Sequence, residues 1–246
     1  MKTVLLLLTG SLLFSASADL VVCTWTGEAG DGKWMTPENW DTGVVPKSGW
    51  GAHTAVISSA GLTPGADGVA VIEVEKNVEV TQLKIAAGSG ALRVTGAQLT
   101  VTQNCGFDGT ITASNAAIVD NASDVPVEIA CDLYTTGQRA ILLGENCDFT
   151  LSGAIKGSGT ATHYQKYGPA SSRFVLSGDI DFPGYTSGSY VNATVTLRGG
   201  TNVIAGVAAN GGFKAGTTVR FGSHWVGGVN TTIEFGAGVY LAKIDL

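Results

Sequence analysis

Charged residues are scarce in this sequence: Asp, Glu, Lys and Arg together make up 14% of its 246 residues. Because Glu, Lys and Gln favour helices, their scarcity excludes long amphipathic helices. In their place the chain has 35 glycines, frequent Val and Thr, and a hydrophobic fraction of 44%. β-Branched residues interrupted by glycine are typical of short strands joined by tight turns, and the hydrophobic fraction is high enough for a large core.

Several motifs of catalysis and metal binding are also missing. The sequence has no C-x-x-C, G-x-S-x-G, H-E-x-x-H or P-loop pattern, and its three histidines, His53, His163 and His224, are far apart. We therefore expect no metal site and no cofactor. The net charge of -6 comes without a basic stripe, which makes nucleic acid and anionic membranes poor partners.

The N-terminal segment, from Met1 to Ala18, has the pattern of a signal peptide. Met1-Lys2 gives a positive start, an apolar run follows from Val4 to Phe14, and Ala16-Ser17-Ala18 is a small-x-small cleavage pattern. A retained membrane anchor is the alternative, but the apolar run is too short to cross a bilayer of about 30 Å as a helix. We expect cleavage near Ala18, no membrane insertion of the mature chain, and a product that is secreted or held at the cell surface.

A near-repeat in the middle of the chain indicates a solenoid. The segment FTLSGAIKGSG starts at Phe149, and a second copy, FVLSGDIDFPG, starts at Phe174. One unit of this length cannot bury its apolar face alone and must stack on the next. The pattern favours an all-β fold in which residues 61–246 form a right-handed parallel β-helix of about eight coils, spaced at about 4.8 Å.

The repeat also predicts a register. Phe149 should stack on Phe174 in the next coil, and Leu151 on Leu176. A β-sandwich or jelly roll is the structural alternative, because its strands have a similar composition. Its hairpins would be marked by Asn-Gly or Asp-Gly turns, of which only two fall among the regular strands.

Four of the five tryptophans lie in a turn-rich segment, residues 19–60, ahead of the regular strands. Large aromatic residues at the end of a solenoid commonly cover its first coil, so we expect this segment to be an N-terminal cap. A carbohydrate-binding module is the alternative. In that case Trp34 and Trp40 would present flat faces to sugar rings, as would tyrosines further along the chain. The tyrosine candidates are Tyr164, Tyr167 and Tyr185.

Four cysteines, Cys23, Cys105, Cys131 and Cys147, follow the predicted cleavage site. An exported chain meets an oxidising compartment, in which disulfides form. Equivalent positions on neighbouring coils are about 4.8 Å apart, within the Cα separation of a disulfide. The spacing of Cys105 and Cys131 is close to that of Phe149 and Phe174, so they are the favoured pair. The alternative is a set of buried thiols.

One pair of carboxylates leaves an enzymatic interpretation open. Asp179 and Asp181 alternate in a predicted strand and would share a face, as an acid and a base acting on a polysaccharide. Lys166 and Arg173 are near in sequence and would stabilise an acidic sugar. A β-helical polysaccharide lyase or glycoside hydrolase requires these residues to meet in one groove. The alternative is a solvated strand end, because Phe182-Pro183-Gly184 follows.

Three segments share one turn-and-strand pattern: LSGAIKGSG, KYGPASSRFVLSGDIDFPGYTSG and VNATVTLRGG. They resemble the autotransporter-associated β-strand repeat, in which a Gly-x-Gly turn, a strand ending in Leu-x-Leu-Ser-Gly and a Tyr-x-Gly loop recur. The tryptophan-rich stretch WTGEAGDGKWMTPENWDTGVVP resembles the opening segment of many secreted bacterial proteins that carry those repeats. The resemblance implies a non-catalytic, passenger-like extracellular β-helix for display or adhesion, with a glycan or a host- or cell-surface ligand as partner.

Overall fold

Short strands make up most of the described part of the chain, together with one 3-10 helix, η1 (Pro37–Asn39). The computed structural model describes residues 21–47, 53–86, 90–102, 119–135, 139–143, 145–157, 163–167, 171–178, 180–181, 194–198, 200–204, 218–221, 231–235 and 243–245. No α-helix occurs in these ranges, as the composition predicted. The predicted signal peptide lies outside them and stays a prediction.

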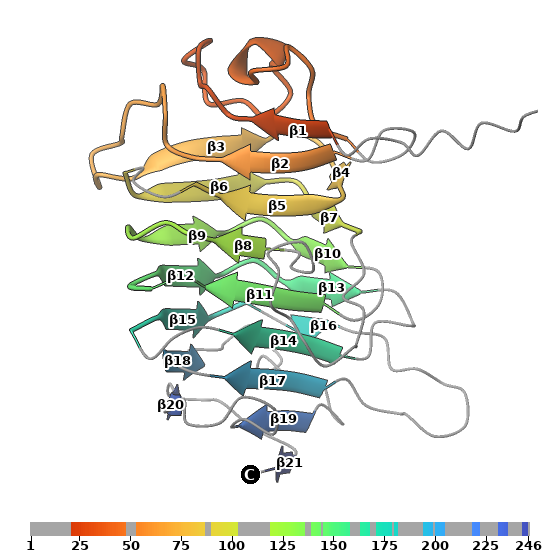
Figure 1. The fold of residues 1–246 in the computed structure, drawn as a ribbon, viewed down its shortest axis with the longest axis vertical. Helices are drawn as coiled ribbons and strands as arrows, with labels where there is room; N and C mark the ends of the chain where they lie inside the picture. Colours follow the sequence, from red (N-terminus) through yellow and green to blue (C-terminus); the bar gives the residue numbers. More distant parts are fainter. Residues whose placement is uncertain are drawn as a thin grey trace, which may run out of the picture.

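The described strands form three sheets, seen in Figure 1. The nine-stranded sheet contains β1 (Val21–Thr24), β2 (His53–Ile57), β5 (Gln82–Ile85), β8 (Val119–Asn121), β11 (Arg139–Leu143), β14 (His163–Tyr167), β17 (Thr194–Arg198), β19 (Thr218–Phe221) and β21 (Lys243–Asp245). The seven-stranded sheet contains β3 (Ala70–Val74), β6 (Leu92–Gly96), β9 (Val127–Ile129), β12 (Asp148–Leu151), β15 (Arg173–Leu176), β18 (Gly200–Ile204) and β20 (Thr231–Phe235). The five-stranded sheet contains β4 (Val78–Val80), β7 (Leu99–Val101), β10 (Leu133–Thr135), β13 (Ile155–Gly157) and β16 (Ile180–Asp181).

The chain winds through these sheets as a right-handed parallel β-helix. It passes from β2 to β3 to β4 and then returns to β5, which pairs with β2 in parallel. In Figure 1 the nine-stranded sheet lies in front with its strands pointing left, and the strands behind it point right as the chain descends. The sandwich alternative is wrong, because its hairpins would pair consecutive strands antiparallel, whereas the strands pair with the coil before and the coil after in parallel.

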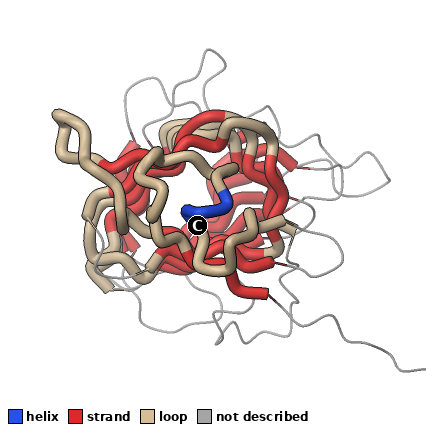
Figure 2. Tube along the Cα trace, turned by 90° about the horizontal axis from the view of Figure 1, so that it is seen from above, coloured by secondary structure: helices blue, strands red, loops and turns tan. Residues whose placement is uncertain are grey.

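Alternating side chains fill the interior of the coils. In β3 the inward residues Ala70, Ile72 and Val74 are buried, and the residues between them are exposed. Figure 2, viewed from above, shows the strands closing around this interior. The predicted register is confirmed: Phe149 pairs with Phe174 in the next coil, and their rings stack with centroids 6.3 Å apart. Burial of each such side chain is worth about 1.5–3 kcal/mol.

The coils differ in length. Asp148 and Arg173, which are partners in the pairing of β12 with β15, are 25 residues apart. Arg93 and Glu128, which are partners in the pairing of β6 with β9, are 35 residues apart. The longer coil places residues 102–118 between β7 and β8, and the parallel register is kept on both sides of it. A constant repeat length is therefore not a property of this solenoid.

Residues 21–47, which we call the cap, lie over the N-terminal end of the stack (Figure 1), whereas residues 53–57 of the segment predicted as a cap form β2 of the first coil. Strand β1 pairs in parallel with β2, and Lys33 forms an isolated bridge with Glu73 on β3. The cap thus continues two of the three sheets with short lengths of backbone. Such a cover satisfies backbone groups that the first coil would otherwise expose.

Candidate functional site

Three tryptophans form the interior of the cap. Trp25 and Trp40 are each 2% exposed, and Trp34 is fully buried. The ring of Trp40 meets Trp25 edge-on at 5.2 Å and Trp34 at 4.9 Å. The indole N–H of Trp40 donates to the Trp34 carbonyl at 2.9 Å. The interpretation of Trp34 and Trp40 as sugar platforms is therefore wrong, because neither presents a ring face to solvent.

A buried asparagine ties the cap loops together. Asn39, fully buried at the end of η1, donates from Nδ2 to Asp31 Oδ1 at 2.7 Å and to the Lys33 carbonyl at 3.0 Å. Its Oδ1 accepts the Ala29 N–H at 3.0 Å. Burial would raise the pKa of Asp31, but hydrogen bonds from Lys33, Thr36 and Asn39 lower it below its ordinary value. These contacts hold three turns of the cap loop together.

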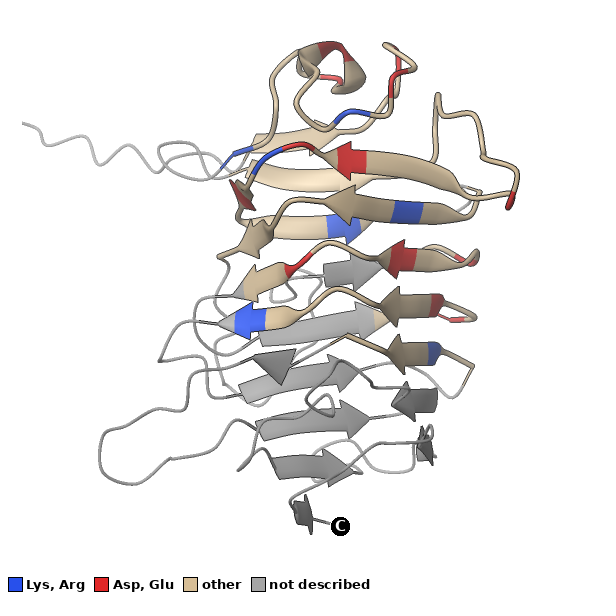
Figure 3. Ribbon diagram, turned by 180° about the vertical axis from the view of Figure 1, so that it is seen from behind, with Lys and Arg blue, Asp and Glu red and all other residues tan. Residues whose placement is uncertain are grey.

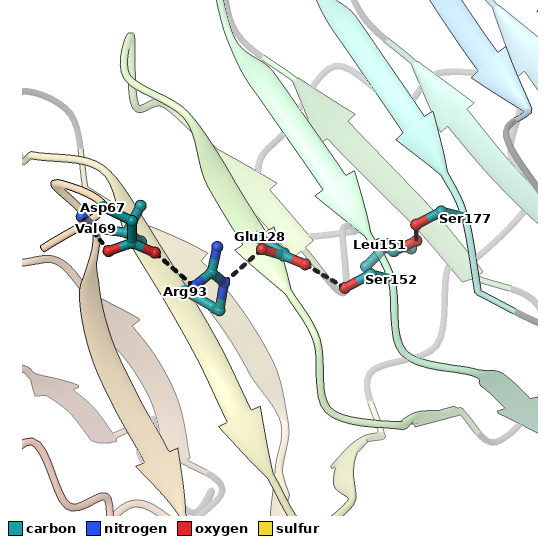
Figure 4. A network of polar contacts seen from close by, with 7 residues as sticks. All are labelled: Asp67, Val69, Arg93, Glu128, Leu151, Ser152 and Ser177. Carbon is teal, nitrogen blue, oxygen red and sulfur yellow. Dashed lines mark hydrogen bonds and ion pairs between the residues drawn. The ribbon is translucent and has the colours of Figure 1, made fainter. Parts of the chain in front are cut away.

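An ion-pair ladder crosses three coils on the outer face of the seven-stranded sheet, shown in Figure 4. Arg93 donates from Nη1 to Asp67 at 3.0 Å and from Nε to Glu128 at 2.6 Å. The other oxygen of Glu128 accepts the hydroxyl of Ser152. Burial alone would raise the pKa of Glu128, but Ser152 and Arg93 outweigh it and hold the pKa below its ordinary value.

Two more ion pairs join neighbouring coils. Arg173 on β15 pairs with Asp148 on β12 at 3.0 Å. Lys156 on β13 pairs with Asp132, which also accepts the backbone N–H of Ala154 at 3.1 Å. Figure 3 shows acidic and basic positions following one another down the back of the stack. The partners in each pair are 24 or more apart in sequence, which is why a search for local motifs missed them.

The proposed catalytic residues do not meet on one sheet. Lys166 lies on β14 of the nine-stranded sheet, Arg173 on β15 of the seven-stranded sheet, and Asp181 on β16 of the five-stranded sheet. The side chain of Arg173 contacts Asp148 instead. Asp179 lies outside the described residues. The three candidates that the structure describes therefore lie on three different sheets, and their meeting in a single groove, which the enzymatic interpretation requires, stays a prediction.

Two of the three tyrosine candidates lie on one strand. Tyr164 and Tyr167 are both in β14, where they pair with Arg139 and Leu142 of β11. Tyr185 lies outside the described residues. The predicted role of these three tyrosines in glycan binding stays a prediction.

The register removes the reason for pairing Cys105 with Cys131. The pairing of β9 with β6 and with β12, continued two residues past Ile129, places Cys131 opposite Gly96 in the coil before and opposite Gly153 in the coil after. In this part of the chain Leu99 pairs with Leu133, a longer spacing than that of the two cysteines, so the spacing argument for this pair does not hold. Cys131 is a free thiol, and Cys105 lies outside the described residues. The bridge therefore has no structural support.

Cys131 occupies a tightly packed corner. It is 2% exposed, and burial raises the pKa of its thiol to about 12. A Cβ added to Gly153 would lie 2.0 Å from the Cys131 carbonyl oxygen, so the backbones of the two coils nearly touch. The thiol thus behaves as a small buried hydrophobic group, which was the alternative interpretation of the cysteines.

A second buried contact, missed by the sequence analysis, lies where the cap meets the first coil. His53, the first residue of β2, is 7% exposed, and its Nδ1 lies 3.5 Å from Sγ of the fully buried Cys23. The same nitrogen accepts the backbone N–H of Lys47 at 3.3 Å. Cys23 and His53 are 30 residues apart, and neither belongs to a recognisable motif.

In the described ranges no group of three or more His, Cys, Asp and Glu side chains is arranged to hold a metal ion. The described residues also contain no helix long and apolar enough to cross a membrane. Comparison of the chain with protein-family models, with curated proteins and with solved structures finds no match.

Proposed function

We propose that this chain is a secreted or cell-surface β-solenoid with a structural or adhesive role and without catalytic activity. The observation that carries the proposal is the use of its charged side chains. Arg93 pairs with acids of the coils before and after it, Glu128 also accepts the hydroxyl of Ser152 in a fourth coil, and Arg173 and Lys156 each pair with an acid of the preceding coil. These groups join coil to coil.

Such pairing suits a rigid rod. Parallel strands fix the spacing of the coils at about 4.8 Å, and the ion pairs link the outer ends of side chains that stand one above another. A stack built in this way presents long, regular faces to a partner. The resemblance to autotransporter repeats supports display or adhesion as the use of those faces, with a glycan or a surface molecule as the ligand.

An activity and binding screen tests the proposal. The full chain and an Asp179→Asn, Asp181→Asn double variant are incubated with acidic and neutral polysaccharides, and both are applied to a glycan array and to intact cells. We expect no cleavage by either protein and equal binding by both. An Asp148→Asn variant is the matched control, because it removes a carboxylate from another sheet.

Two results would contradict the proposal in different ways. Cleavage by the parent that disappears in the double variant, but not in the Asp148→Asn control, would establish an enzyme. Absence of binding to every glycan and cell surface tested would exclude the adhesive role and leave the structural one.

A further inference from the structure

His53 contacts both ends of the described cap segment. Its Nδ1 approaches Cys23 on β1, near the start of residues 21–47, and accepts the N–H of Lys47 at the end. His53 itself belongs to β2 of the first coil. The ring therefore connects the entry and the exit of the cap to the stack beneath it.

These contacts depend on the protonation state of the ring. Nδ1 accepts a hydrogen bond only while it keeps its lone pair, which requires a neutral imidazole with its proton on Nε2. Protonation places an N–H on Nδ1, directly opposite the N–H of Lys47. Two donors then face each other in a buried position. The neighbour left to accept from Nδ1 is the sulfur of Cys23, which is a weak acceptor, so the hydrogen bond to Lys47 is lost without an equal replacement.

The charged groups around His53 do not offset this conflict. Among the described residues Lys47 acts on His53 as a cation, and its charge opposes a second positive charge on the ring. The thiol of Cys23 has a raised pKa because it is buried, so it supplies no negative charge at neutral pH. Asp41 is near Cys23 but accepts the backbone N–H of β1 at 2.8 Å. Residues 48–52, Ser-Gly-Trp-Gly-Ala, contain no titratable side chain.

We propose that His53 is an acid-sensitive latch, which holds the N-terminal cap on the first coil while its ring is neutral and releases the cap when the ring is protonated. Burial, and then the charge of Lys47, lower the pKa of His53 below its ordinary value of 6.5. A lowered pKa in the folded chain means that protons favour the open cap. The stabilisation is complete above pH 6.5 and is lost as the pH falls below it.

Amide hydrogen exchange of the full chain tests the latch. The N–H of Trp25 donates to the carbonyl of Val56 at 2.8 Å and so reports attachment of the cap to the first coil. We expect its protection factor to fall about fivefold between pH 7.5 and 5.5, the effect of losing one buried hydrogen bond. The N–H of Leu133, which donates to Ala154 in the stack at 2.8 Å, should keep its protection factor.

The variant His53→Asn keeps a side-chain acceptor but cannot be protonated, so its Trp25 protection should not change with pH. The variants His163→Asn and His224→Asn are matched controls and should behave like the parent. A constant Trp25 protection factor in the parent, or the same fall in His53→Asn, would overturn the proposal.

A direct titration covers the case in which the His53→Asn cap is open at every pH. The ring nitrogens of His53 are then followed by NMR in the parent protein. The titration midpoint in the folded chain must lie below 6.5, and Trp25 must lose protection as the pH falls from 6.5 towards that midpoint. A titration midpoint at or above 6.5, or a Trp25 protection factor that stays constant over this interval, would also overturn the proposal.

Discussion

Phe149 in the coil stack and Trp34 in the cap are equally buried, but different kinds of neighbour bury them. Phe149 stacks on Phe174, its equivalent one coil later, and the same relation holds for Leu151 and Leu176. Trp34 packs edge-on against Trp40, and no repeat relates the two. In the stack, the same contact between equivalent residues recurs from coil to coil. In the cap, each contact between side chains occurs once.

Backbone geometry shows the same contrast. Gly27 and Gly61 both have positive φ, at 66° and 68°, and a Cβ on Gly27 would lie 2.1 Å from the carbonyl oxygen of Ala60. That oxygen also accepts the indole N–H of Trp25 at 3.1 Å. The cap therefore requires particular residues at particular places, while the stack requires mainly an apolar residue at every second position.

The largest expected effect on stability comes from removing one side chain of the repeated stacking in the core. Phe149→Ala removes one ring of a stacked pair and leaves a cavity, which should lower the free energy of unfolding by about 3–5 kcal/mol. Urea denaturation followed by far-UV circular dichroism measures this loss. Phe149→Leu serves as control and should lose clearly less. A loss below about 1 kcal/mol for Phe149→Ala would show that the core adapts where we expect it to be rigid.

A smaller and more local effect is expected in the cap. Asn39→Ala removes three hydrogen bonds inside the cap and should cost about 1–3 kcal/mol there. We expect tryptophan fluorescence to change at lower urea concentration than far-UV circular dichroism. Asn77→Ala, which removes one exposed contact to the Gln98 N–H, should leave the two transitions together. Coincident transitions in Asn39→Ala would mean that cap and stack unfold as one unit.

The outer ladder should contribute less again. Glu128→Gln keeps the shape but weakens both contacts, and because the side chains of Arg93 and Glu128 are 34% and 28% exposed, we expect a loss of about 1 kcal/mol. Since the pKa of Glu128 is lowered, its contribution is complete above pH 4.5 and disappears as the pH falls through the lowered value. Urea denaturation from pH 7 to pH 3 measures this.

Glu73→Gln is the control for that series, since it removes an exposed glutamate from the same sheet. It should change stability little at any pH. An unchanged difference between parent and Glu128→Gln at pH 3 and pH 7 would contradict the role of the charge.

The smallest effect is expected for Arg173→Gln. Its pair with Asp148 is exposed on both sides, at 47% and 39%, and solvent screens such pairs. We expect a loss within about 0.5 kcal/mol that vanishes in 1 M NaCl. A loss above about 1 kcal/mol, persisting in salt, would show that Arg173 contributes far more to the stability of the rod than an exposed pair does.

The sequence predicted what depends on periodicity. The stacking of Phe149 on Phe174 followed from the spacing of two copies of one motif, and the short strands without long helices followed from composition. The pairing of Cys105 with Cys131 relied on the same spacing, but the coil that contains Cys105 is longer. The number of residues per coil differs from coil to coil in this solenoid. The spacing between equivalent residues in one pair of coils therefore does not predict the spacing in another pair.

Residues close in sequence were also expected to be close in space. Lys166, Arg173 and Asp181 all fall within one coil, but that coil turns two corners between them and distributes them over three sheets. The opposite assumption, that residues far apart in sequence are far apart in space, concealed the ladder. Arg93 and Glu128 form an ion pair although 35 residues separate them. The alternative with Trp34 and Trp40 exposed to solvent could not be excluded from the sequence, because composition gives the number of aromatic rings but not the direction in which they face.

The unequal coils have a practical consequence for protein engineering. Between β7 and β8 the chain carries the long segment 102–118, and the pairings of both strands with the coils before and after remain in register. Lengthening a connection of this kind costs little, about 0.6 kcal/mol for each doubling of a flexible loop. Because the flanking strands keep their register around a connection of this length, foreign peptides inserted between β7 and β8 should leave the winding of the rod unchanged, which would make the solenoid a frame for presenting epitopes.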